Sequence, residues 1–146
     1  MSLTSVPSPI GEVFVLDSWV FLERALKGVR VQRLDALIEM AAASQVTLLL
    51  SEMNLGEIFY LVSKQKGEAT AEAVLQTILQ LPIAVVPVLS GDVMNAARLK
   101  AGTTLSYADC FCAVLALRFG ASIVTGDPDF LKLQPSGLLR VDWVGA

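Results

Sequence analysis

The sequence predicts an α/β protein, a three-layer α/β/α sandwich with a central parallel sheet of about five strands. Short apolar runs alternate along the chain with segments that have helical spacing. The runs are apolar throughout rather than at every second residue, which is typical of strands covered by helices on both faces. The 146 residues contain no repeat and no interdomain linker, so we expect one domain over residues 13–146 after a flexible lead-in over residues 1–12.

Five apolar runs are expected to form the strands. Each is short, is rich in Val, Leu or Ile, and gives way to polar or turn-forming residues. Pro87 lies within the third run and predicts that this strand is at an edge or ends there. The strands are predicted over residues 13–16, 46–51, 84–88, 121–126 and 139–144.

Helices are expected between these strands, because apolar residues recur there at helical spacing. Gly67 ends one helix as a C-cap, Pro82 stops the next, and Ser90 begins another as an N-cap. The segment between the first strand and residue 33 is too mixed for a helix to be assigned, and residues 127–133 form a turn with one helical turn. The helices are predicted over residues 33–43, 54–67, 68–81, 90–102 and 106–120.

The composition is unusually apolar, with 54% hydrophobic and 17% charged residues and a mean hydropathy of +0.62. Some apolar surface is therefore expected to meet a partner. No run reaches the ~18 apolar residues of a membrane span, and the first residues, MSLTSVPSPIGE, do not resemble a signal peptide. We expect a cytoplasmic protein with no membrane contact. Cys110 and Cys112 point to different faces of a predicted helix and are interpreted as core residues.

The chain contains no histidine. This excludes a Ser-His-Asp triad, a Cys-His pair, a His-ligated zinc and a ribonuclease mechanism with paired histidines. The net charge of −3 argues against a surface that coats nucleic acid. The basic residues are unevenly distributed, however, and one cluster is a candidate for RNA-backbone contacts as well as for ordinary solvated helix ends. This cluster contains Arg24, Lys27, Arg30 and Arg33.

Acidic residues stand where functional groups gather in a parallel sheet. Asp17 directly follows the first strand, and Asp127 and Asp129 follow the fourth. The carboxyl ends of parallel strands meet at one edge, so these side chains are expected there. A structural alternative for Asp17 is an N-cap of the segment that follows it.

Two further acids lie on helices that are apolar nearly all round. Glu57 is preceded by Asn54 and Asp109 by Ser106, at the spacing of a capping box, which would give each acid a purely structural role. Buried carboxylates repel one another, however, and take up protons unless a cation compensates them. Several such acids together predict a shared site for a divalent cation with oxygen ligands, Mg²⁺ or Mn²⁺. The pattern by itself names no substrate.

Four segments in order and spacing resemble the motifs of PIN-domain proteins, and among these the VapC-type toxins of prokaryotic toxin–antitoxin pairs. The resemblance covers roughly residues 13–143. It implies a five-stranded α/β/α sandwich, metal-dependent endoribonuclease activity on RNA, a homodimer, and inhibition by a small cognate antitoxin protein. The segments are VFVLDS, LLLSEMNLGEIFYLV, LSYADCFCAVLAL and ASIVTGDPDFLKL.

The resemblance also assigns roles to individual residues. The four family acids, expected to be catalytic and to hold Mg²⁺ or Mn²⁺, match Asp17, Glu57, Asp109 and Asp127. Asp129 stands where many members have a further acid that assists the metal site, and Ser18 and Thr125 match small hydroxyl residues that support it. One position departs from the family pattern, because Trp19 stands where many members carry a small polar residue. We interpret this change as variation within the subfamily, with altered substrate access as the alternative.

The resemblance and the lack of histidine agree on metal-assisted hydrolysis of a phosphodiester. Water would attack, so the products would carry 5′-phosphate and 3′-hydroxyl ends. Two alternatives remain open at this point. One is a phosphatase or phosphotransferase with Asp17 as nucleophile, which would normally have a second aspartate where Trp19 stands. The other is a non-catalytic interaction module on the same fold.

Overall fold

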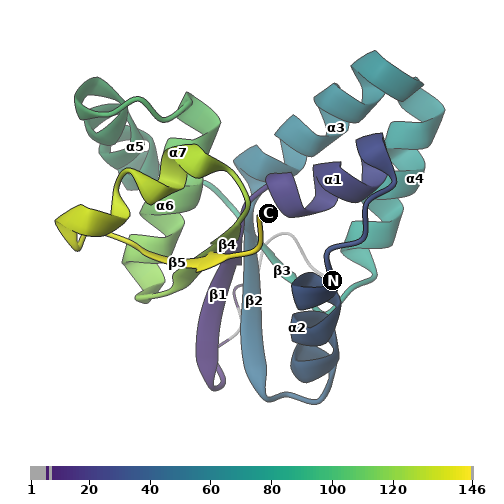
Figure 1. Ribbon diagram of the computed structural model, residues 1–146, viewed down its shortest axis with the longest axis horizontal. Coiled ribbons are helices and arrows are strands. Elements are labelled where there is room, and N and C mark those ends of the chain that lie inside the picture. Colours follow the sequence, from purple (N-terminus) through teal and green to yellow (C-terminus); the bar gives the residue numbers. More distant parts are fainter. Residues whose placement is uncertain (1–5, 7, 146) are drawn as a thin grey trace.

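A five-stranded parallel sheet forms the middle layer of the molecule (Figure 1), and its strand order is β3-β2-β1-β4-β5. The structure is a computed structural model that describes residue 6 and residues 8–145. The predicted fold class is confirmed, and β3 lies at an edge of the sheet, as Pro87 indicated. The strands are β1 (Glu12–Leu16), β2 (Val46–Ser51), β3 (Ala84–Val86), β4 (Ser122–Thr125) and β5 (Arg140–Trp143).

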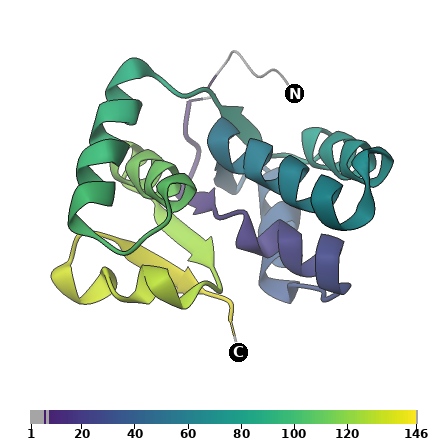
Figure 2. The same cartoon turned by 90° about the horizontal axis from the view of Figure 1, so that it is seen from above.

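Helices cover both faces of the sheet (Figure 2), with α1 to α4 on one side and α5 to α7 on the other. A short 3-10 helix, Gln134–Ser136, leads into β5. The helices are α1 (Trp19–Lys27), α2 (Gln32–Ala42), α3 (Glu52–Lys66), α4 (Glu68–Leu79), α5 (Ser90–Gly102), α6 (Tyr107–Phe119) and α7 (Pro128–Leu131).

Alternation along the buried strands divides the interior into two cores. Leu16 and Leu50 point toward α1 to α4, whereas Val15 and Leu49 point toward α5 to α7. Successive side chains of a strand point to opposite faces, so a strand between two helical layers must be apolar at every position. Both cysteines are free and buried on α6 in the second core, which confirms their interpretation as core residues.

Helix α1 was not predicted. Its apolar residues follow β1 almost directly, and Ser18 at its N-cap position makes no side-chain capping bond. The signal lies at its other end, where Gly28 adopts a left-handed conformation with φ of 69° and its N–H donates to the carbonyl of Arg24. A glycine at this position, preceded by Arg24 and Lys27 in the last turn, is typical of a helix end.

The N-cap residues of two helices differ from the prediction, although α5 itself has the predicted bounds, residues 90–102. Helix α5 begins at Ser90 itself, so Leu89 rather than Ser90 occupies the N-cap position. Helix α3 begins before Asn54, with the hydroxyl of Ser51 accepting a hydrogen bond from the N–H of Met53 at 3.3 Å. Ser51 ends β2 in an extended conformation and is therefore placed to cap the helix. Asn54 lies inside α3, so the capping-box alternative for Asn54 and Glu57 is wrong.

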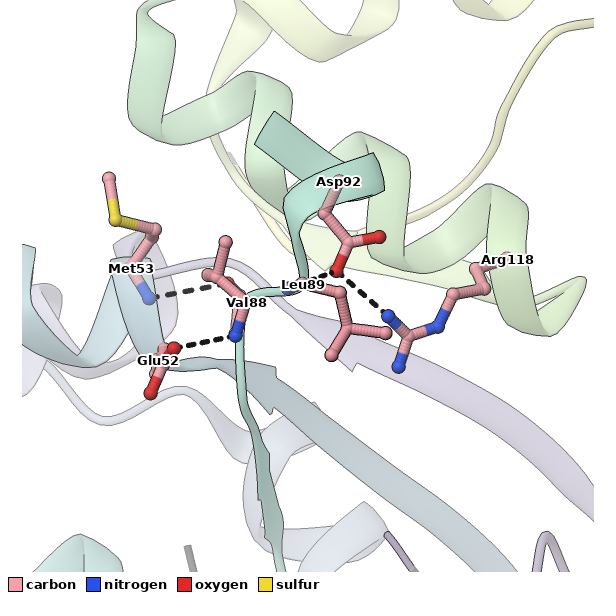
Figure 3. A network of polar contacts seen from close by, with 7 residues as sticks. Glu52, Met53, Val88, Leu89, Asp92 and Arg118 are labelled. Atoms are coloured by element: carbon pink, nitrogen blue, oxygen red, sulfur yellow. Dashed lines mark hydrogen bonds and ion pairs between the residues drawn. The ribbon is translucent and has the colours of Figure 1, made fainter. Parts of the chain in front are cut away.

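A polar network joins α3, the β3–α5 connection and α6 (Figure 3). Glu52 accepts a hydrogen bond from the N–H of Val88 at 2.6 Å. Asp92 accepts one from the N–H of Leu89 at 2.9 Å and pairs with Arg118 at 2.8 Å. These bonds satisfy backbone groups beyond the end of β3 and fix the start of α5 against α6.

Residues 1–5 and 7 of the predicted lead-in lie outside the described residues. Within the described part, Ile10 exchanges two hydrogen bonds with the hydroxyl of Thr47 on β2, at 2.7 and 2.9 Å. The flexibility of residues 1–12 and the domain boundary at residue 13 stay predictions. Over residue 6 and residues 8–145, no helix has the length and apolar character needed to cross a bilayer.

Candidate metal centre

The candidate site lies where the strand order of the sheet reverses. From β1 the chain continues to β2 and β3 on one side, whereas β4 and β5 lie on the other. Ligands of parallel α/β sheets bind in the crevice at the carboxyl ends of such strands. Asp17 directly follows β1, and its N–H donates to the carbonyl of Val124 at 3.1 Å. Asp127 follows β4, so both carboxylates are delivered to this crevice.

Three carboxylates come together here. Asp17, Asp109 and Asp127 each offer an oxygen, and these oxygens lie within 4.8 Å of one another. Asp109 comes from the first turn of α6, where its N–H donates to the hydroxyl of Ser106 at 3.2 Å. Asp127 also caps α7, because it accepts a hydrogen bond from the N–H of Asp129 at 2.9 Å. The capping and site interpretations are therefore compatible at these two positions.

The hydroxyl of Thr125 hydrogen-bonds Asp17, which is 1% exposed. Thr125 Oγ1 donates to Asp17 Oδ2 at 2.8 Å and accepts from the N–H of Asp127 at 2.9 Å. Ser18 Oγ lies 3.5 Å from Asp17 Oδ1 but makes a closer hydrogen bond to Glu57 Oε1. A hydroxyl carries one proton, so the proton of Ser18 goes to Glu57. Ser18 rather than Asp17 occupies the N-cap position of α1, so the alternative of Asp17 as a cap is wrong.

Two of the predicted ligands lie outside the group of three. Glu57 is half-buried on α3 and reaches Asp17 only through Ser18. Asp129 pairs with Lys132 at 3.1 Å, and its side chain is 41% exposed. Their roles at the metal, like the catalytic roles of all the acids, stay predictions.

Asn54 is a residue at the site whose position was misinterpreted. It is fully buried on α3, and its Nδ2 donates to the carbonyl of Ala108 at 3.2 Å. This bond ties α3 to the first turn of α6, next to Asp109. Its Oδ1 has no hydrogen-bond partner in the described part of the chain. Asn54 and Glu57 are three residues apart and share a helix face, so an amide beside an acid on an apolar helix was the available signal.

The electrostatics of the group show an excess of negative charge. Burial, followed by the charge of Asp109, raises the pKa of Asp17 to about 8, against the hydrogen bond from Thr125. Burial also raises the pKa of Asp109 to about 6, against the hydrogen bonds of Ser106 and with a further contribution from the charge of Asp127. None of the ion pairs formed by the described residues involves these three acids.

This donor set fits a divalent cation. A cation among the carboxylates would favour their charged forms, which burial now disfavours. All the available donors are oxygens, which suits Mg²⁺ or Mn²⁺ better than a metal that prefers nitrogen or sulfur. The acidic group is thus consistent with the predicted metal site.

The basic cluster of the sequence is largely neutralised. Lys27 pairs with Glu23 at 3.0 Å, Arg30 pairs with Asp35, and Arg33 pairs with Asp142 at 2.8 Å. Arg24 is exposed on α1. Contacts from this cluster to an RNA backbone stay a prediction.

Comparison with known families decides the relationship. The family model of the PIN domain matches residues 14–134. The chain belongs to the PIN domain family. The match includes the three clustered acids as well as Glu57 and Asp129, so the resemblance noted from the motifs is confirmed. No curated protein sequence matches this PIN domain.

Solved structures similar to this PIN domain include VapC toxins of VapBC toxin–antitoxin systems. VapBC2 from Rickettsia felis, bound to a promoter DNA fragment, has a TM-score of 0.69 at 18% identity over 89% of this chain and 97% of that chain. DNA-bound VapBC from Salmonella typhimurium has a TM-score of 0.69 at 17% identity over 90% and 97%. VapC20 of Mycobacterium tuberculosis, a toxin that cleaves the sarcin–ricin loop, has a TM-score of 0.65 at 17% identity over 88% and 98%. At these identities the likeness shows the fold.

Proposed function

We propose that this PIN domain is an Mg²⁺- or Mn²⁺-dependent endoribonuclease and the toxin of a VapBC-type pair. The observation that carries the proposal is the group of three carboxylates at the carboxyl edge of the sheet, within 4.8 Å of one another. The likeness to VapC20, which cleaves an RNA loop, supports RNA as the substrate class.

The chain's own residues would bind the cation and keep its ligands in place. Asp17, Asp109 and Asp127 would hold it, with Glu57 and Asp129 as further candidates. When bound, the cation would lower the pKa of a water molecule and neutralise charge on the phosphodiester. Thr125 would keep the carboxylate of Asp17 in one orientation, because it already donates to Oδ2 at 2.8 Å.

A phosphatase with Asp17 as nucleophile is less well supported. The side chain is almost completely buried, and one of its oxygens accepts the hydrogen bond from Thr125. A nucleophile must reach the phosphorus atom of its substrate, which this environment disfavours. The raised pKa of Asp17 also leaves little of the carboxylate form at neutral pH without a cation.

The direct test is cleavage of single-stranded RNA in Mg²⁺ or Mn²⁺ and in EDTA. We expect cleavage to depend on the metal, and we expect Asp17→Asn and Asp109→Asn to lower the cleavage rate by at least about 100-fold. The loss should be this large because mutating residues that only orient metal ligands already lowers activity by about 10- to 100-fold. Asp35→Asn removes a surface carboxylate and is the matched control, which should cleave normally. If both site variants cleave at the wild-type rate, the site assignment is wrong.

We also propose a small antitoxin and a second copy of the chain as partners. A groove with a volume of about 520 Å³ lies between α1, α2 and α4 and is largely apolar, with Phe21, Ile38 and Val74 among its lining residues. Such a groove fits the apolar side of a peptide segment. These features and the toxin–antitoxin complexes among the similar structures support the antitoxin proposal.

Co-expression with the product of an adjoining reading frame tests the antitoxin. We expect the two proteins to copurify, and we expect Val74→Asp to prevent this because it places a charge in the apolar groove. Leu138→Asp alters an exposed residue outside the groove and is the control. Copurification that survives Val74→Asp would rule out the groove, and light scattering of the isolated chain would establish whether it forms a dimer.

A further inference from the structure

The two tryptophans of the chain line one pocket. Trp19 begins α1 and Trp143 ends β5, and the pocket lies between α1, the α1–α2 connection and the chain after β5. Its volume is about 520 Å³, which is within the range of sites that bind small molecules. This pocket is separate from the apolar groove on α1, α2 and α4.

Two residues that line the pocket contact the segment that leads to the acidic group. Trp19 follows Asp17 by two residues, and its indole covers Gly126 so closely that a Cβ there would lie 2.4 Å from the ring. On the opposite side, the N–H of Val144 donates to the carbonyl of Thr125 at 3.0 Å. Trp19 and Val144 therefore join the pocket to the segment after β4, which carries Asp127.

The ring of Trp143 is packed against the backbone on one side and is partly exposed to solvent. Its indole lies over Gly145, where a Cβ would come within 2.3 Å of the ring. The residue is nevertheless 37% exposed. Packing on the backbone orients the ring, and its exposed part is available for contact with a planar ligand.

The charges that line the pocket cancel. Glu23 and Asp142 oppose Arg30 and Arg33. Arg33 engages both oxygens of Asp142, at 2.8 and 3.4 Å. A phosphate group would require cations that are free of carboxylates. A neutral, planar heterocycle with polar edges suits this environment better, since bases stack on indoles without regard to charge.

We propose that the pocket binds an unpaired nucleobase of the RNA beside the scissile phosphodiester. The base would stack on Trp143, and Trp19 would form the wall nearest the carboxylates. This inference rests on the proposed function and deepens it, because a pocket for an extruded base selects single-stranded or looped RNA over a duplex. It also assigns a role to Trp19, the position at which the chain departs from its family.

Tryptophan fluorescence tests base binding without requiring catalysis. The wild-type protein in EDTA is titrated with each of the four nucleoside 5′-monophosphates and, as a probe that lacks a base, with ribose 5-phosphate. At least one nucleotide is expected to quench the fluorescence, corrected for absorption, while ribose 5-phosphate leaves it unchanged. If no nucleotide quenches more than ribose 5-phosphate, the proposal is overturned.

Variants locate the effect. In EDTA, Trp143→Ala is expected to raise the Kd for a short single-stranded RNA about tenfold, as loss of one stacking ring does, and Trp143→Phe should restore most of the affinity. Tyr60→Ala removes an exposed aromatic residue on α3 outside the pocket and should bind as the wild type does. If Trp143→Ala binds RNA with the wild-type affinity, the proposal is overturned. This holds even if the same variant no longer binds the antitoxin. If the wild-type protein does not cleave RNA, the nuclease proposal is refuted. The fluorescence titration and the RNA-affinity measurement would still test base binding, because neither requires cleavage.

Discussion

Acidic side chains occupy two different environments in this molecule. At the surface, acids pair with lysine or arginine side chains of the same chain. At the carboxyl edge of the sheet, three acids lie within 4.8 Å of one another, and none of the ion pairs among the described residues includes them. The paired acids are Glu23, Asp35, Asp92, Asp129 and Asp142.

The difference concerns what neutralises each charge. Exposed ion pairs contribute little, about 0.2–1 kcal/mol each, because water already stabilises both partners. Buried carboxylates lack that solvent, so the pKa values of Asp17 and Asp109 rise to about 8 and about 6. Three carboxylates kept together with no ion pair among the described residues are consistent with a site for a cation from outside the chain.

The largest expected effect concerns pH. In the metal-free protein, Asp17 and Asp109 have folded-state pKa values above the ordinary 3.8, so the folded state binds more protons than the unfolded state. Stability is then greatest below about pH 4 for these groups and falls as pH rises, by up to about 1.4 kcal/mol per pH unit for each group. The fall in stability that Asp109 causes stops near pH 6, and the fall that Asp17 causes stops near pH 8.

Urea unfolding in EDTA across this pH range measures the trend. Asp17→Asn should flatten the slope between pH 6 and 8, because this range lies above the raised pKa of Asp109 and below that of Asp17. A slope in the variant equal to that of the wild type would show that Asp17 does not carry excess charge.

Metal binding should reverse this destabilisation. At a Mn²⁺ concentration about 100 times its Kd, the folded state gains about 2.7 kcal/mol. Thermal unfolding with Mn²⁺ and with EDTA would detect this gain in the wild type. Asp109→Asn should show no such gain, because one ligand of the metal is missing. A gain of equal size in that variant would show that the metal does not bind at these acids.

The next prediction tests whether the hydroxyl of Thr125 orients Asp17. Thr125→Val keeps the shape of the side chain and removes the hydrogen bond to Asp17 Oδ2. Residues that orient metal ligands typically contribute 10- to 100-fold in affinity, and we expect a loss of about that size in Mn²⁺ affinity, measured by calorimetry. Thr77→Val removes a hydroxyl bonded to the carbonyl of Ala73 on α4 and is the matched control. Similar Mn²⁺ affinities in the two variants would argue against the orienting role.

The smallest effect concerns the surface. Asp35→Asn removes the partner of Arg30 and should lower the urea midpoint of unfolding only slightly, because water stabilises the exposed guanidinium without its partner. The loss should shrink in high salt, because exposed pairs are screened. A large loss of stability in this variant would show that the surface acids do not differ from the three carboxylates at the carboxyl edge of the sheet in the way described.

The sheet was the most predictable part of the fold. β2 was predicted with both of its bounds, because a strand buried on both faces is apolar at every position. Helix α1 was missed because Trp19, Val20 and Phe21 favour strands as much as helices. The fold rather than its local propensity determines that segment.

The site was predictable only in part. Asp17 and Asp127 could be placed at one edge because parallel strands bring their carboxyl ends together. The spacing of Asn54 and Glu57 could have placed both on one face of α3, but it could not predict the contact of Asn54 with Ala108, which joins two helices distant in sequence. A helical turn was predicted over residues 127–133 and α7 confirms it, but the sequence did not show that Asp129 would pair with Lys132.

Calorimetric titration of Mn²⁺ at pH 7, in two buffers with different ionisation enthalpies, tests the central claim most directly. The wild type should bind Mn²⁺ and release protons, because the raised pKa of Asp17 keeps much of this acid protonated until the metal binds. Asp17→Asn should lose this binding, and Asp35→Asn should keep it. Absence of binding in the wild type, or equal binding in Asp17→Asn, would contradict a metal centre built on these three carboxylates.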